Sequence, residues 1–206
     1  MAGRLVTIEG LDGAGKTTLA TALVQALAAR GVEAVSLREP GGVELSERVR
    51  ALVKDPGLRI GAAAEALLYA AARAQLVEER VRPLLAEGRW VLLDRFVDSS
   101  LAYQGAARGL GVDRVRMLNL FATGGLVPDR TLLLALDPAT GRARLAGRAE
   151  APDRLEAEDA AFFARVAEAY EALARREPAR IRVLDAGRPE ADVLAAALAA
   201  LEDLLP

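Results

Sequence analysis

The chain has 206 residues, a formal net charge of −2, and neither cysteine nor histidine. This composition excludes disulfides, thiolate metal sites and imidazole acids or bases, so any chemistry must use carboxylates, hydroxyls, arginines and bound metal. The balanced charge gives no overall positive field to attract nucleic acid. No apolar run approaches the ~20 residues that cross a bilayer, and no export signal is visible. We expect a soluble, cytoplasmic protein without nucleic-acid or membrane partners.

Short runs rich in valine, leucine and isoleucine alternate along the chain with amphipathic stretches of alanine, leucine and arginine. The runs predict strands at Leu5–Glu9, Glu33–Leu37, Trp90–Asp94, Thr131–Asp137 and Arg180–Leu184. The stretches between them predict helices at about 16–29, 44–54, 61–86, 99–108, 112–121, 138–147, 156–175 and 189–204. This alternation is typical of an α/β fold, a five-stranded parallel sheet with helices on both faces. No linker divides the chain, so we expect one domain over 1–206.

The connections after the strands are the expected place for a ligand. In open parallel sheets, ligands bind beyond the carboxyl ends of the strands. The loops at 9–16, 38–43, 94–99 and from 137 onward should therefore share one edge of the sheet.

The clearest motif is "GLDGAGKT" at residues 10–17, which fits G-x-x-x-x-G-K-[ST] between a predicted strand and a predicted helix. In such a P-loop, backbone N–H groups and a helix start bind phosphate oxygens. Lys16 is expected to reach the terminal phosphates, and the Thr17 hydroxyl suits Mg²⁺. The motif predicts a nucleoside triphosphate bound by Gly10, Leu11, Asp12, Gly13, Ala14, Gly15, Lys16, Thr17 and Thr18.

The P-loop does not by itself name the reaction, because kinases, GTPases and several ATPase classes share it. The only asparagine is Asn119, in "MLNLF", so the N-K-x-D pattern of guanine-specific switches is absent. Small phosphotransferases are the leading class. A regulatory ATPase whose output is a partner-binding switch is the rival interpretation.

Three further segments could hold a second phosphate-bearing substrate. Arg38 and Glu39 follow the second predicted strand in "LREPGG", while Asp94 and Arg95 follow the third in "LLDRF". Asp94 could hold Mg²⁺ through water, and a guanidinium grips phosphate in a bidentate manner. On the long predicted helix, Tyr69 and Arg73 are four residues apart and share a face, as suits a base stacked beside its phosphate. The alternatives are a core aromatic and local ion pairs.

Taken together, these motifs resemble the bacterial thymidylate kinase family. The segments "EGLDGAGKTT", "REPGG", "DRFVDSSLAYQG" and "PDRTLLLALDP" occur in the family's order and spacing. The segments "GRARLAGRAEAPDRLEAED" and "FFARVAEAYEALA" extend the likeness to about residue 175. The resemblance implies transfer of the γ-phosphoryl group of ATP to deoxythymidine monophosphate (dTMP), with Mg²⁺, by a homodimer.

The resemblance also implies roles for individual residues. Asp12 and Glu39 would lie near the sugar, and Tyr69 would stack on thymine. The arginines that would surround the acceptor phosphate or the base edge are Arg38, Arg73 and Arg95. The residues that would read the base and pack against the 2′ position, at helical spacing, are Ser100, Tyr103 and Gln104. Tyr69 and Ser100 replace residues that relatives commonly have as Phe and as Asn or Thr, so a kinase for another nucleoside monophosphate stays open.

The absence of histidine agrees with this chemistry. A phosphate monoester with a second pKa near ~6 is already mostly dianionic at neutral pH, so it needs no general base. Catalysis should instead rest on in-line positioning and on positive charge at the transferring phosphoryl group, with Lys16, Asp12 and Arg95 as catalytic residues.

A segment at about 141–155 is expected to complete the site. It carries Arg142, Arg144, Arg148 and Arg154 among Gly141, Gly147 and Pro152. We interpret it as a lid that closes over ATP, excludes water and delivers an arginine, with Arg148 and Arg154 as the leading candidates. The alternative is a charged surface excursion.

Overall fold

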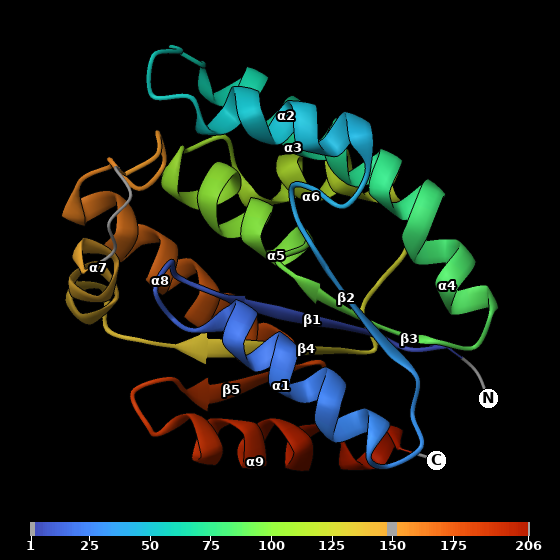
Figure 1. Ribbon diagram of the computed structural model, residues 1–206. Helices are drawn as coiled ribbons and strands as arrows, with labels where there is room; N and C mark the ends of the chain where they lie inside the picture. The colour runs from blue at the N-terminus through green and yellow to red at the C-terminus, as the bar shows by residue number, and fades with distance from the viewer. Residues whose placement is uncertain (1–2, 148–151, 206) are drawn as a thin grey trace.

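The computed structural model describes residues 3–147 and 152–205. It contains a five-stranded, entirely parallel sheet in the order β2-β3-β1-β4-β5 (Figure 1). The strands are β1 (Leu5–Gly10), β2 (Ala34–Arg38), β3 (Trp90–Asp94), β4 (Arg130–Ala135) and β5 (Ile181–Asp185). The predicted fold class is confirmed, and every predicted strand end lies within two residues of the observed one.

Helices cover both faces of the sheet (Figure 1). On one face lie α1 (Lys16–Ala28) and α9 (Glu190–Leu201), which continues into η3 (Glu202–Leu204). The other face is covered by α4 (Arg82–Ala86), α5 (Val97–Ser100), η2 (Leu101–Ala107) and α8 (Ala160–Arg176). The central strand β1 is buried along its whole length, as expected for a strand sandwiched between helices.

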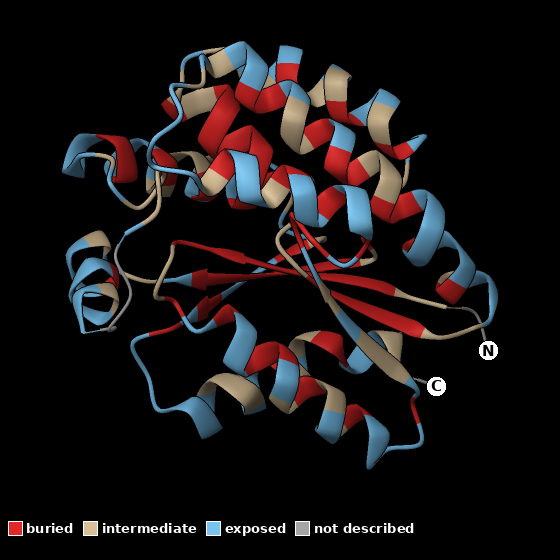
Figure 2. Cartoon of the chain, turned by 45° about the horizontal axis from the view of Figure 1, so that its top comes forward, coloured by how far each residue is buried: buried red, intermediate tan, exposed pale blue. Residues whose placement is uncertain are grey.

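A further group of helices lies outside this second layer. These are α2 (Glu44–Lys54), α3 (Ala62–Leu76) and α6 (Val112–Thr123), which pack on one another, α3 and α6 also packing on η2. The predicted helix 61–86 is α3 followed directly by η1 (Val77–Val81) and α4. Figure 2 shows that these helices bury one side and expose the other.

Two later elements differ from or refine the expectation. The structure has α7 at Pro138–Ala146, which matches the predicted helix 138–147 and overlaps the start of the expected lid, and it starts α8 at Ala160 where the sequence predicted 156. The Asp159 side chain accepts a hydrogen bond from the Phe162 N–H at 2.7 Å and so caps the helix. Just before it, Asp153 accepts hydrogen bonds from the Leu155 and Glu156 N–H groups, which holds a turn in place of another helical turn.

The carboxyl ends of the strands meet at one edge of the sheet. Asp94 on β3 is in register with Ile8 on β1 and with Arg38 on β2, and Gly10 pairs with Leu134 on β4. The loops that leave these positions therefore start side by side. Within the described residues, no helix is long and apolar enough to cross a membrane.

Candidate active site

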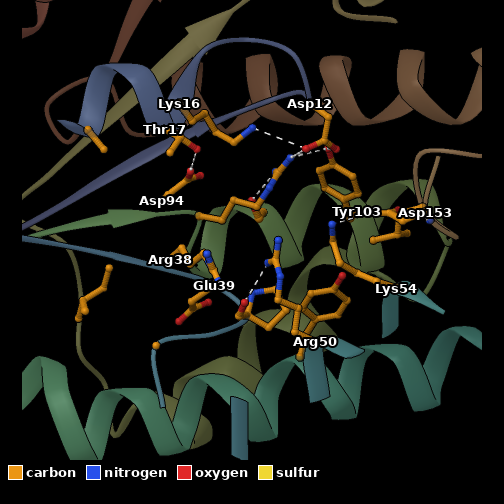
Figure 3. A pocket seen from close by; sticks show the side chains of 18 of the residues that line it. Asp12, Lys16, Thr17, Arg38, Glu39, Arg50, Lys54, Asp94, Tyr103 and Asp153 are labelled. Carbon is orange, nitrogen blue, oxygen red and sulfur yellow. Dashed lines mark hydrogen bonds and ion pairs between the residues drawn. The ribbon is translucent and has the colours of Figure 1, made fainter. Parts of the chain in front are cut away.

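One cavity of about 660 Å³ opens at this edge of the sheet. Its walls come from the P-loop, the loop after β2, the end of β3 with α5 and η2, the facing sides of α2 and α3, and the turn at 153–156. Figure 3 shows side chains from all these elements pointing into the same space. The sequence expectation that the loops after the first three strands meet at a ligand site is met by this arrangement.

The P-loop curls around its own lysine. Lys16 is 7% exposed, donates a hydrogen bond from Nζ to the Leu11 carbonyl at 2.9 Å, and lies 3.8 Å from Asp12 Oδ1. Burial lowers the pKa of Lys16 to about 8, with Arg95 adding to this effect and Asp12 opposing it. A buried cation with so few anionic partners is suited to receive phosphate oxygens.

Glycine is needed in this loop because other backbone comes very close to it. Gly13 has a φ of +81°, and a Cβ there would lie 2.5 Å from the Gly141 carbonyl oxygen. The first turn of α7 therefore rests directly on the P-loop. This contact brings the connection after β4 to the same edge as the other three.

Thr17 and Asp94 form the hard-oxygen pair expected for Mg²⁺. The Thr17 hydroxyl donates to Asp94 Oδ2 at 2.7 Å, from the start of α1 to the end of β3 (Figure 3). Among the described residues, no group of three or more carboxylates, histidines or cysteines surrounds a metal position. The donor set fits Mg²⁺ held mainly by phosphate oxygens and water, with one or two protein oxygens.

Arg95 is held by a cluster of oxygen atoms. Its Nη2 donates to Asp12 Oδ1 at 2.6 Å and to the Tyr103 hydroxyl at 3.2 Å, and its Nη1 donates to Ser99 Oγ at 3.0 Å. Its guanidinium carbon also lies 5.0 Å from the centre of the Tyr103 ring. Burial alone would raise the pKa of Asp12, but the Arg95 and Lys16 cations hold it well below its usual range.

Arg95 also has an unusual backbone. Its φ of +69° is the only positive value at a non-glycine residue in the described chain. Such a conformation is strained, and it persists because the surrounding contacts determine it. Strain at the residue that follows a strand end points to a functional position.

Glu9, which precedes the P-loop glycine, lies fully buried beneath this cluster. It accepts hydrogen bonds from the Phe96 N–H at 2.8 Å, Ser99 Oγ at 2.5 Å and the Tyr170 hydroxyl at 3.0 Å. Burial, reinforced by Asp98, raises the pKa of Glu9 to about 7. The sequence analysis assigned no role to Glu9, Ser99 or Tyr170, because nothing local shows that these three segments converge.

Arg73 is enclosed by partners. Its side chain is only 1% exposed. The Arg73 Nε donates to Glu39 at 2.7 Å, and Nη2 donates to the Phe96 carbonyl at 3.0 Å. The third nitrogen, Nη1, donates to Ser100 and Asn119. Its Nη2 also lies 2.6 Å from Glu39 Oε2. Glu39 is equally buried, and its Oε1 has no hydrogen-bond partner among the described residues. Burial raises the pKa of Glu39 above its usual value, although the Arg73 cation acts in the opposite direction.

The remaining expected substrate residues lie on α3 and along α5 and η2, and one of them, Tyr103, reaches back to the P-loop, where its hydroxyl donates to Asp12 Oδ2 at 3.4 Å. Tyr69 is half-buried on α3, while Ser100, Tyr103 and Gln104 are almost wholly buried on the continuous helical run of α5 and η2. One helical run thus presents all three of the latter residues, as their spacing indicated. Arg38 also borders the cavity, but its side chain is 57% exposed and pairs with Glu47 at 3.0 Å.

The expected lid arginines are placed differently from one another. Arg148 lies outside the described residues. Arg144 is exposed on α7 and reaches the Gly13 carbonyl at 3.4 Å and the Ala186 carbonyl at 3.2 Å. Arg154 is held far from solvent: its Nε donates to the Val53 carbonyl at 2.9 Å, and its Nη2 lies 2.6 Å from Glu65.

Arg154, which the sequence analysis expected to act on lid closure, is paired in this structure with groups on α2 and α3. Its backbone N–H also bonds to the Lys54 carbonyl, and the neighbouring Asp153 pairs with Lys54 Nζ at 2.8 Å. The reason is tertiary: the C-terminal end of α2 and the first turn of α3 offer carbonyls and a buried carboxylate to the turn that carries Arg154. Arg154 thus ties the turn at 153–156, which borders the cavity, to α2 and α3.

Two basic residues on α2 were missed by the sequence analysis. Arg50 and Lys54 border the cavity, and Arg50 donates to the Pro40 carbonyl at 3.0 Å (Figure 3). They are four residues apart and so share a helix face, which was a usable signal. Without the position of α2 over the site, that face is indistinguishable from a solvated one.

Comparison with known proteins assigns a family to this geometry. The family model described as thymidylate kinase matches residues 8–197, which include the P-loop, the cavity and α8. The chain belongs to the thymidylate kinase family. A protein named thymidylate kinase from Alkalilimnicola ehrlichii is 50% identical over 206 residues, covering 98% of this chain and 92% of its own.

Other members of the thymidylate kinase family give the same result. The thymidylate kinase from Halorhodospira halophila is 46% identical, covering 99% of this chain and 96% of its own. The thymidylate kinase from Deinococcus radiodurans is 49% identical, covering 98% of this chain and 97% of its own. The family assignment supports a kinase, and it does not favour the rival interpretation as a regulatory ATPase.

Proposed function

We propose that this chain transfers the γ-phosphoryl group of ATP to dTMP, and that both substrates occupy the 660 Å³ cavity. The observation that best supports this proposal is that a single cavity is lined both by the P-loop lysine and by Tyr69, Ser100 and Gln104. A triphosphate at one end and a nucleoside at the other would place two phosphate groups between them. That is the arrangement direct transfer requires.

The P-loop residues 10–18 bind the donor phosphates in this proposal. Its backbone N–H groups and the start of α1 supply partial positive charge, and Lys16 supplies a full one. Lys16 is already desolvated, so its interaction with a phosphoryl group that gains negative charge is stronger than it would be in water.

Mg²⁺ is part of the proposal, held at Thr17 and Asp94 with the donor phosphates. When bound, it neutralises phosphate charge and orients the transferring group. The hydrogen bond between these two side chains indicates that both oxygens already face one point. Thr17 lies at the start of α1 and Asp94 ends β3, and these two packed elements keep that point fixed.

The acceptor end combines a stacking surface with polar groups. Tyr69 would stack on the base, and Ser100, Tyr103 and Gln104 would contact its edge and the sugar. Glu39 has a buried, unpartnered oxygen beside the cavity, which suits a hydrogen bond from a substrate hydroxyl or N–H group. Arg38, Arg50 and Arg73 add positive charge around the acceptor.

Arg95 and Asp12 act where the two phosphates meet. The acceptor phosphate is a dianion at neutral pH and attacks without a general base. Arg95 offsets the charge repulsion between donor and acceptor, while Asp12 keeps its guanidinium oriented through their 2.6 Å ion pair. Catalysis then rests on position and electrostatics, which agrees with a chain that contains no histidine.

We also propose a homodimer formed through α3 and α6. Large apolar side chains are exposed there: Phe121 is 88%, Met117 63%, Leu67 57% and Leu120 51% exposed. Such a patch on adjacent helices is typical of a protein interface. Light scattering after size-exclusion chromatography tests this proposal. The unaltered chain should have twice the mass of a monomer, and the Phe121→Arg variant should have the mass of a single monomer. A monomeric unaltered chain would exclude the dimer.

The decisive experiment measures ADP production with a panel of nucleoside monophosphates as acceptors. We expect strong stimulation by dTMP and identification of the diphosphate as product. Strong stimulation by a different monophosphate alone would replace the acceptor in this proposal. ATP hydrolysis without any phosphorylated acceptor would overturn the kinase assignment.

A further inference from the structure

Glu65 is a buried carboxylate at the acceptor end of the cavity that the proposed mechanism does not use. It lies in the first turn of α3, one turn before Tyr69, and is fully shielded from solvent. Its Oε1 accepts hydrogen bonds from Gln104 Nε2 at 2.9 Å and Arg108 Nε at 3.2 Å. Its Oε2 accepts from Arg108 Nη2 at 3.2 Å and lies 2.6 Å from Arg154 Nη2.

The contact with Gln104 determines which end of its amide is free. A carboxylate only accepts hydrogen bonds, so the NH₂ group of Gln104 must face Glu65. The Gln104 carbonyl oxygen, Oε1, has no hydrogen-bond donor among the residues the structure describes, and Gln104 borders the cavity beside Tyr69. The group left available to a ligand there is therefore a hydrogen-bond acceptor.

The orientation is costly to reverse. Flipping the amide would set the Gln104 carbonyl oxygen against the buried Glu65 carboxylate. Two hydrogen-bond acceptors would then face each other with no proton between them. Glu65 itself is held by two arginines, one of which, Arg108, also pairs with Glu158 at 2.6 Å and lies over the Phe162 ring. Glu65 cannot easily turn away, so the acceptor remains presented.

We propose that Glu65 is a specificity-determining positioning residue, which fixes the Gln104 amide so that its carbonyl oxygen faces the base and selects a pyrimidine ring with an N3–H donor. Thymine and uracil carry that donor. Cytosine has a lone pair at N3, which would meet the Gln104 oxygen acceptor to acceptor and lose the hydrogen bond. The inference rests on the proposed function, since it concerns how the same acceptor site chooses its base.

The same carboxylate links base selection to the turn at 153–156. Arg154 reaches Glu65 from that turn, whose residues Asp153, Leu155 and Glu156 border the cavity. Loss of the Glu65 charge would therefore loosen both the amide and this wall. Both effects weaken acceptor binding and leave the P-loop end unchanged.

The test compares dTMP, dUMP and dCMP as acceptors for the unaltered chain and for Glu65→Gln. We expect the unaltered chain to use dTMP and dUMP and to reject dCMP and N3-methyl-dTMP. In Glu65→Gln, we expect the dTMP-to-dCMP ratio of kcat/KM to fall at least tenfold. The loss should appear mainly as a higher KM for dTMP, with the KM for ATP within twofold of the original.

Glu158→Gln is the matched control. It makes the same chemical change and also removes a partner of Arg108, but among the described residues the Gln104 amide is bonded to Glu65 and not to Glu158. The dTMP-to-dCMP ratio of kcat/KM in Glu158→Gln should stay within twofold of the ratio in the unaltered chain. A ratio that falls equally in both variants would show a general structural effect and overturn the proposal, as would an unchanged ratio in Glu65→Gln.

Two measurements keep the result interpretable. If Glu65→Gln does not fold, Glu65→Asp retains the charge but withdraws the carboxylate by one methylene, and we expect an intermediate fall in the ratio. Equal use of dTMP and N3-methyl-dTMP by the unaltered chain would overturn the proposal without any variant. No phosphorylation of dTMP by the unaltered chain would instead refute the proposed function, which separates the two failures.

Discussion

Glu9 and Arg95 are joined through two hydroxyl groups, those of Ser99 and Tyr170. Ser99 Oγ donates to Glu9 Oε2 at 2.5 Å and accepts from Arg95 Nη1 at 3.0 Å. Glu9 lies directly before the P-loop glycine, so the strand that begins the donor site also orients the arginine proposed to meet the acceptor phosphate. The two halves of the site are thus built on one buried carboxylate.

This relationship predicts a pH dependence of stability. The pKa of Glu9 is about 7 in the folded chain against an ordinary value of 4.5, because burial and Asp98 disfavour its ionised form. Between these pH values the folded state holds more protons, so the free energy of unfolding falls as pH rises, by about 3 kcal/mol in all. Glu9→Gln cannot ionise and should lack this loss. Urea unfolding from pH 4.5 to 8 measures the difference, and parallel curves for the two proteins would contradict the prediction.

Lys16→Ala should reduce turnover by orders of magnitude and leave the fold intact. The desolvated Lys16 ammonium neutralises charge on the transferring phosphoryl group, and the contacts it would lose in the free protein are one hydrogen bond to the Leu11 carbonyl and the 3.8 Å ion pair with Asp12. Steady-state kinetics and circular dichroism are the measurements. Turnover near that of the unaltered chain would place the phosphate site elsewhere.

Tyr69→Ala should weaken the binding of dTMP much more than the binding of ATP. The ring is half-buried beside Gln104 at the end of the cavity away from the P-loop, so its removal takes away base stacking only. Loss of one base–aromatic contact is worth about 1–3 kcal/mol, or roughly fivefold to 150-fold in the dTMP dissociation constant. Tyr69→Phe serves as control and should retain binding. Equal losses for both substrates in Tyr69→Ala would indicate a structural role.

Arg73→Ala should destabilise the fold as well as lower acceptor binding. Its guanidinium is buried and bonded to Glu39, Ser100, Asn119 and the Phe96 carbonyl, so removal leaves Glu39 buried and uncompensated. Breaking a buried ion pair in this way costs about 3–5 kcal/mol. Thermal unfolding alongside Tyr69→Ala separates the effects, because Tyr69 has no such partner set. An Arg73→Ala melting temperature equal to that of Tyr69→Ala would contradict the prediction.

Three of the four arginines of the expected lid should behave differently from one another. Arg154→Ala should raise the KM for dTMP with little change in kcat, since Arg154 pairs with Glu65 at the acceptor end. Arg144→Ala, on an exposed part of α7, should change both constants less than threefold, in line with the ~1 kcal/mol limit of exposed pairs. Arg148→Ala should lower kcat more than either KM if Arg148 delivers charge in the transition state. If all three variants matched the parent enzyme, the lid hypothesis would have to be abandoned.

The sequence by itself determined the strands, the P-loop and the position of most cavity residues along the chain. These features depend on local properties: buried strands read as short apolar runs, and the P-loop needs glycines and a lysine at set spacings. Residues placed directly after strands, such as Asp94 and Arg95, could be assigned to the site because parallel strands end at one edge. The lid role of Arg148 and Arg154 also rested on local composition, and it stays a prediction.

Only the tertiary structure decided which charged groups meet. Arg154 was a lid candidate by composition, yet it pairs with Glu65 from a helix almost ninety positions earlier, because α2 and α3 lie over the turn that carries it. Glu9 and Tyr170 stand 161 residues apart, yet the Tyr170 hydroxyl donates a hydrogen bond to Glu9 Oε2 at 3.0 Å. Such pairings depend on strand order and helix packing, which the periodicity of a single segment does not encode.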